Sequence, residues 1–121
     1  MIIFQENILT VNAYSYTVQY MEKQETIMSK FVVLYKLKER KGFTGDLVKN
    51  HVEHLRNLSK KNILLLCGLL KGNGAMLILK AKSLKEAKEY ILQDPVIIQK
   101  KYEYKIHELI EANEDNNFLL K

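Results

Sequence analysis

The spacing of apolar and polar side chains changes several times along the chain, and each change marks a predicted element. Residues 31–38 are rich in side chains that favour strands, whereas apolar residues between positions 47 and 58 recur at helical spacing. Asp46 precedes the helical stretch as its expected N-cap. The helix should end near Asn62, because asparagine tolerates the left-handed conformation in which many helices stop. These patterns predict a strand followed by an amphipathic helix.

Two more strands and a second helix are predicted further along the chain. Residues 63–70 and 75–80 are apolar at nearly every position and flank the turn sequence Lys-Gly-Asn-Gly, so we expect them to pair as a hairpin. The uninterrupted apolar run of residues 63–70 predicts a buried strand. Ser83 and Glu86 have the spacing of a capping box, which places a helix over residues 84–92.

A last strand is predicted from residue 102, where apolar and polar side chains alternate. At Glu108 the alternation slips by one residue. Either a bulge re-phases the strand there, or the strand ends and Leu109 and Ile110 pack separately. The resulting order, β-α-β-β-α-β, is that of the α+β ferredoxin-like fold, with two helices on one face of a four-stranded antiparallel sheet.

The length of 121 residues fits a single domain. We predict an α+β domain over residues 30–113, an N-terminal extension over residues 1–29 and a C-terminal tail over residues 114–121. Alternation between residues 14 and 20 favours a strand within the extension. Because the second and third strands of the domain are apolar on both faces, the face without helices needs a cover. We expect a second copy of the chain, closing a dimeric α+β barrel, and the N-terminal extension is the competing cover.

Composition excludes several classes of protein. Apolar residues make up 47% of the chain and charged residues 27%, and the net charge of +5 comes from lysines mixed with glutamates. No secretory leader and no membrane-spanning apolar run are visible, so we expect a cytoplasmic protein without a membrane partner. We expect Cys67 to be a small inert core residue. Because the sequence has no zinc spacing, phosphate loop or nucleotide fingerprint, we expect neither a metal nor a cofactor.

The predicted element order also occurs in RNA-recognition domains, which stack bases on aromatic side chains of the third strand. Here residues 75–79 read Ala-Met-Leu-Ile-Leu and contain no aromatic ring. The stacking platform is missing, so we expect no nucleic-acid partner.

Two histidines lie on the first predicted helix. At ~100° per residue, His51 falls within the apolar arc together with Leu55, whereas His54 lies at its margin. An aspartate partner would hold one tautomer of His51 and make the ring a usable general base. Asp94 is the candidate acid, because it follows the second helix and Pro95 fixes its local backbone. The simpler interpretation is that Asp94 only caps a turn and His51 is a satisfied core histidine.

Two matched stretches carry a resemblance to a known family. After His51, leucines stand at the fourth and seventh positions, then come Asn62 and a leucine-rich strand that leads to Gly68. The second stretch starts at Ser83 with Ser-Leu-Lys-Glu-Ala, continues to the Asp-Pro pair at residues 94–95 and ends in a strand that contains a tyrosine. In order and spacing, these stretches resemble the YciI-like (YCII-related) family over about residues 31–111.

The resemblance implies a dimeric α+β barrel in which a histidine and an aspartate form the active-site pair. The register places His51, not His54, on the family histidine. The resemblance also links at least one branch of the family to dehydrochlorinase-type elimination. Asn62 replaces the usual glycine, Leu69 stands where proline is common and Val96 where an aromatic residue is common. The last two departures lie beside the expected pocket, so they leave the ligand open.

From these observations we predict a homodimer with a small-molecule pocket between helices and sheet. His51, oriented by Asp94, is the expected catalytic base of a cofactor-independent lyase or isomerase reaction. Four further residues are expected to bind the substrate: His54, Tyr35, Gly68 and Tyr102. The alternative is a small-molecule-binding or structural dimer that performs no chemistry.

Overall fold

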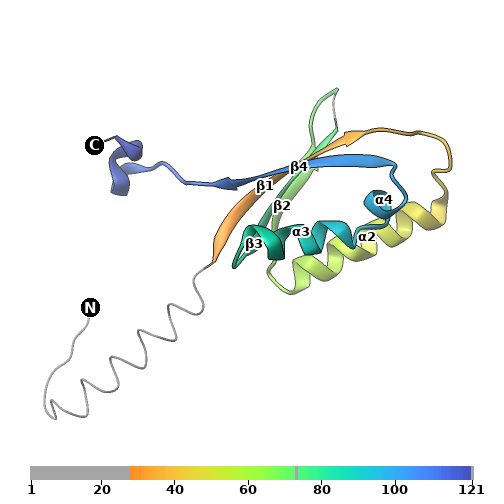
Figure 1. The fold of residues 1–121 in the computed structure, drawn as a ribbon, viewed down its shortest axis with the longest axis horizontal. Coiled ribbons are helices and arrows are strands. Elements are labelled where there is room, and N and C mark those ends of the chain that lie inside the picture. The colour runs from red at the N-terminus through yellow and green to blue at the C-terminus, as the bar shows by residue number, and fades with distance from the viewer. Residues whose placement is uncertain (1–27, 73, 121) are drawn as a thin grey trace, which may run out of the picture.

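The computed structural model describes residues 28–72 and 74–120 (Figure 1). The elements are β1 (Ser29–Leu37), α2 (Gly45–Lys60), β2 (Leu64–Leu69), β3 (Ala75–Ala81), α3 (Leu84–Leu92), α4 (Pro95–Ile98), β4 (Tyr102–Leu109) and the short 3₁₀ segment η1 (Glu114–Leu119). The strand expected between residues 14 and 20 lies outside the described residues.

The four strands form one antiparallel sheet in the order β2-β3-β1-β4. The central strands are therefore β1 and β3, while β2 and β4 form the two edges. Figure 1 shows α2, α3 and α4 together on one side of the sheet. This arrangement confirms the predicted α+β, ferredoxin-like fold.

Alternate side chains of the central strands build the core on the helix-covered face. In β1, Phe31, Val33 and Tyr35 are buried there, and Leu77 and Leu79 of β3 are buried beside them. The helical part of the chain completes this core with Leu47, Leu58, Ala87, Ile91 and Val96. The intervening strand residues point to the opposite side of the sheet, which we call the open face: Val32, Leu34, Met76 and Ile78, all of them half-buried.

Side-chain caps begin the two longer helices. The N-cap of α2 is Thr44, whose Oγ1 accepts a hydrogen bond from the backbone N–H of Leu47 at 3.1 Å, so the expected cap at Asp46 is wrong. Asp46 lies in the first turn instead, where its charge favours the positive end of the helix dipole. The expected cap of α3 at Ser83 is confirmed. Among the described helices, none is long and apolar enough to cross a membrane.

The burial expected for β2 is wrong. Leu66 is 54% exposed and Leu69 is 87% exposed, and Cys67 is exposed as well. The physical reason is that β2 is an edge strand whose pairing with β3 shifts register between Leu64 and Leu66. An apolar run without alternation therefore did not mean burial within one copy of the chain.

The end of β4 fits neither of the alternatives expected at Glu108. The pairing of β1 with β4 keeps one register from Leu37 opposite Tyr102 to Lys30 opposite Leu109. The strand then ends, and Ile110 is 70% exposed. No bulge re-phases the strand. The other alternative is wrong as well, because β4 runs through Glu108 to Leu109, and both Leu109 and Ile110 are exposed instead of packing into the core.

Candidate functional site

Asp94 sits between α3 and α4 and is completely buried. Its backbone follows the last turn of α3, and its Oδ1 accepts a hydrogen bond from the backbone N–H of Val96 at 3.1 Å, which caps α4. Pro95 occupies the first turn of α4, where a residue without an N–H is tolerated. Asp94 therefore does act as a cap, but it is not only a cap, because its carboxylate has two further side-chain partners.

His51 reaches Asp94 from the middle of α2. Its Nδ1 lies 2.8 Å from Oδ1 and 3.0 Å from Oδ2 of the carboxylate. An ionised carboxylate only accepts hydrogen bonds, so Nδ1 carries the proton and donates it. In the neutral imidazole Nε2 then holds the free lone pair. The His51 side chain is 24% exposed, so the ring is reachable while its partner is not.

Tyr35 makes the third contact to the carboxylate. Its hydroxyl donates a hydrogen bond to Oδ2 of Asp94 at 2.7 Å. Burial, together with the nearby charge of Asp94, raises the pKa of Tyr35 well above its usual range, so the phenol keeps its proton. The Tyr35 ring centre also lies 6.5 Å from that of His51. Strand, helix and loop therefore converge on one buried carboxylate.

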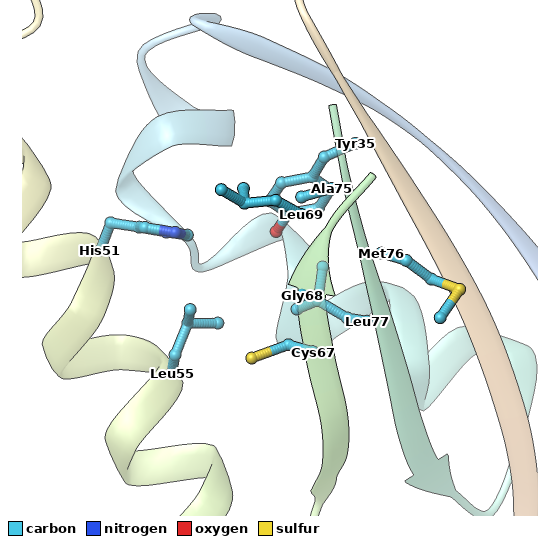
Figure 2. Close-up of a pocket in the computed structure, with 9 residues that line it drawn as sticks. All are labelled: Tyr35, His51, Leu55, Cys67, Gly68, Leu69, Ala75, Met76 and Leu77. Carbon is cyan, nitrogen blue, oxygen red and sulfur yellow. The ribbon is translucent and has the colours of Figure 1, made fainter. Parts of the chain in front are cut away.

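A cavity of about 220 Å³ adjoins this cluster (Figure 2). Figure 2 shows the His51 ring extending from α2 toward the strands, and the Tyr35 hydroxyl pointing back toward His51. Its lining consists of Tyr35, His51, Leu55, Cys67, Gly68, Leu69, Ala75, Met76 and Leu77. These residues are mostly apolar, so the imidazole is the main acid–base group that the wall presents.

The predicted site residues do not all meet at this cavity. His51, Tyr35 and Gly68 line it, and Asp94 lies directly behind His51. His54 instead donates from Nε2 to the backbone carbonyl of Tyr90 at 3.0 Å, which ties α2 to α3. Tyr102 packs against Tyr35, with the two ring centres 5.7 Å apart, and it lines a neighbouring hollow of about 680 Å³.

Two features of the site were missed in the sequence. The bond between Tyr35 and Asp94 was not foreseen, although the alternation of β1 already places Tyr35 on the same face as Val33. Cys67 lines the cavity because it lies opposite Leu77, on the helix-covered face of the sheet. An unbroken apolar run hides that orientation, so no signal in the sequence pointed to it.

Comparisons with known proteins agree with the fold. No family model and no curated protein matches the chain. Among solved structures it is similar to 5-chloro-2-hydroxyhydroquinone dehydrochlorinase (TftG) from Burkholderia phenoliruptrix AC1100, in a complex with 2,5-dihydroxybenzoquinone, with a TM-score of 0.52 and 19% identity. The match covers 73% of this chain and 99% of that one. At this identity the similarity shows a shared fold alone.

The arrangement is suited to moving protons. Asp94 holds Nδ1 of His51, which leaves Nε2 as the acceptor at the cavity wall. Within residues 28–72 and 74–120, no group of three or more histidine, cysteine and acidic side chains is placed to hold a metal ion. The chemistry that these side chains themselves offer is removal or return of a proton on a small bound molecule.

Proposed function

We propose that this protein binds a small organic molecule in the 220 Å³ cavity and that His51, oriented by Asp94, acts on it as a general base. The observation that carries the proposal is the contact of Nδ1 with both carboxylate oxygens, at 2.8 and 3.0 Å. That contact selects the tautomer with a free Nε2. A positioned base of this kind accelerates proton transfer by roughly 10²–10⁴-fold.

The cavity supports a ligand about the size of one ring. Typical drug-sized ligands occupy pockets of about 300–1,000 Å³, and this cavity is smaller. Its lining contains no lysine, arginine, aspartate or glutamate. A compact ligand with an acidic O–H or C–H suits these walls better than a phosphorylated one. The ligand named with the structurally similar dehydrochlorinase, 2,5-dihydroxybenzoquinone, is of this size and class.

The reaction class we propose is a lyase or isomerase step that needs only proton transfer. In an elimination, the base takes a proton from the substrate, the electrons of the broken bond form a new π-bond, and the leaving group departs with its own electron pair. His51 is the group placed to take that proton, and Asp94 stabilises the imidazolium that results. Membership of the YciI-like family is part of this proposal, supported by the ordered motifs and by the fold.

We also propose that two copies associate through the open face. Val32, Leu34, Met76 and Ile78 place apolar side chains there, and Lys36 opposite Glu103 puts charges of both signs at its margin. A two-fold pairing of such a face brings unlike charges together as readily as like ones, and it buries the apolar centre.

Sedimentation of the full chain tests this association. The wild type should sediment as a dimer and Ile78→Lys as a folded monomer, because a charge in the centre of a buried interface is costly. A wild-type chain that stays monomeric at high concentration would overturn the dimer. If deleting residues 1–27 then makes it associate, the N-terminal segment is the cover instead.

Turnover tests the function itself. With 5-chloro-2-hydroxyhydroquinone as the first probe, chloride release should be lost in His51→Ala and Asp94→Asn. It should be retained in the controls Asn50→Ala and Asp46→Asn, which change exposed positions of α2. Unchanged release in His51→Ala would contradict the base. Binding of 2,5-dihydroxybenzoquinone without turnover of any small phenol or carbonyl compound would favour the non-catalytic binding module.

A further inference from the structure

We propose that Tyr35 is a positioning residue: its hydroxyl fixes the carboxylate of Asp94, and through it the imidazole of His51, instead of binding the substrate. This inference deepens the proposed function and rests on it. Tyr35 lines the cavity, so a substrate contact is the obvious role for its phenol. The hydrogen bonds at the site argue for the other role.

The first argument is the number of donors that Asp94 receives. Oδ1 accepts from Val96 N–H at 3.1 Å and from His51 Nδ1–H at 2.8 Å, while Oδ2 accepts from the Tyr35 hydroxyl at 2.7 Å. A completely buried carboxylate needs such donors, because burial without hydrogen bonds disfavours its charge. Without Tyr35, Oδ2 would keep only its longer contact to Nδ1, at 3.0 Å.

The second argument is the direction of the phenol proton. Tyrosine has one O–H, and here it points to Asp94. Burial and the charge of Asp94 raise the pKa of Tyr35, so the proton stays on the phenol. Tyr35 cannot donate to a ligand without releasing the carboxylate. To the cavity it presents the ring and oxygen lone pairs only.

The third argument is rigidity. Tyr35 lies on a central strand and pairs with Ala75 on one side and Tyr104 on the other, whereas Asp94 lies in the connection between two helices. Gly74 packs so closely on the backbone of Tyr35 that an added Cβ would come within 2.0 Å of the Tyr35 carbonyl oxygen. The phenol therefore anchors a loop carboxylate to the best-held part of the sheet.

The test is the tautomer of His51, read from the ¹⁵N resonances of its ring in histidine-labelled full-length protein at about pH 8, above the ordinary imidazole titration range. In the wild type, Nδ1 should be protonated and Nε2 unprotonated. In Tyr35→Phe, the two resonances should move toward each other, because a carboxylate with fewer restraints no longer holds one tautomer. Tyr104→Phe is the matched control, since Tyr104 lies opposite Tyr35 on the same face, and it should leave the His51 resonances unchanged.

The outcomes separate this inference from the proposed function. If His51 gives wild-type resonances in Tyr35→Phe but not in Asp94→Asn, the positioning role is wrong and the pair stands. If Asp94→Asn also leaves them unchanged, the pair itself fails. If Tyr35→Phe does not fold, the wild-type protein decides. A Tyr35 hydroxyl proton that is protected from exchange with water supports the role, and one that exchanges freely overturns it.

Steady-state kinetics with a substrate give a second test. Tyr35→Phe should lower kcat and leave KM nearly unchanged, whereas loss of a residue that contacts the substrate would raise KM.

Discussion

The two faces of the sheet carry apolar side chains from the same strands, yet these side chains are buried to different extents. On the helix-covered face, Val33 and Leu79 are completely buried, and the equally buried Asp94 is hydrogen-bonded to both His51 and Tyr35. On the open face, Val32 and Ile78 are only half-buried. The difference shows what the proposed proton-transfer site depends on. The helices exclude water from one face of the sheet, so the Asp94 carboxylate there is bound by protein donors. The face without helices stays partly exposed to solvent.

The largest expected effect comes from neighbouring residues of β3 that face opposite sides of the sheet. Leu79→Ala should lower the free energy of unfolding by about 2–5 kcal/mol, because it leaves a cavity in the packed core. Ile78→Ala, at a half-buried position, should cost about 1 kcal/mol, and the loss should depend on protein concentration if the open face is an interface. Urea denaturation at two protein concentrations measures both. Equal, concentration-independent losses would mean that one chain already covers both faces.

An intermediate effect is expected from two aspartates that both lie near helix starts. Asp94→Ala should cost about 2–3 kcal/mol, because the cap of α4 is lost and the Tyr35 hydroxyl is left without its acceptor. Asp46→Ala, at an exposed position of α2, should cost less than about 1 kcal/mol through the helix dipole. Thermal and urea unfolding compare the two. Similar losses would show that Asp94 is only a cap.

The smallest effect concerns pH. The pKa of Tyr35 is raised in the folded chain, so above about pH 10, where an unfolded tyrosine ionises, the folded chain binds more protons than the unfolded one. The stability that Tyr35 contributes is therefore fully present below about pH 10 and is lost as the pH rises further. Tyr35→Phe should remove up to about 1.4 kcal/mol per pH unit from the alkaline slope. Identical slopes in urea unfolding of the two proteins would contradict a buried, protonated Tyr35.

The site was predictable to the extent that it depends on local pattern. Helical spacing selected His51 over His54, and the Asp-Pro pair located Asp94. The hydrogen bond from Tyr35 was not predictable. Alternation assigns Tyr35 to a face of the sheet, but it does not say which loop packs against that face. The distinction between Thr44 and Asp46 as the cap of α2 was hidden for a similar reason. Both residue types cap helices, and only the backbone decides which one does.

In the fold, too, features set by local sequence pattern were predictable and features set by the assembled sheet were not. The order of the strands and of the two longer helices was readable from changes in periodicity, whereas the short helix α4 was not predicted. Asn62 does adopt the left-handed conformation, with φ of 61°. The exposure of β2 was not readable, because an unbroken run of leucines has no alternation to mark which face is covered. Edge position is a property of the assembled sheet and not of the strand's own residues.

The ¹⁵N spectrum of His51 in the wild-type protein, recorded before and after addition of 2,5-dihydroxybenzoquinone, tests the His51–Asp94 base most directly. We predict a protonated Nδ1 and an unprotonated Nε2 in the free protein, because Nδ1 donates to Asp94. We also predict that bound ligand shifts the Nε2 resonance and leaves Nδ1 protonated. A free protein with its proton on Nε2 and none on Nδ1 would contradict the role of His51 as a base.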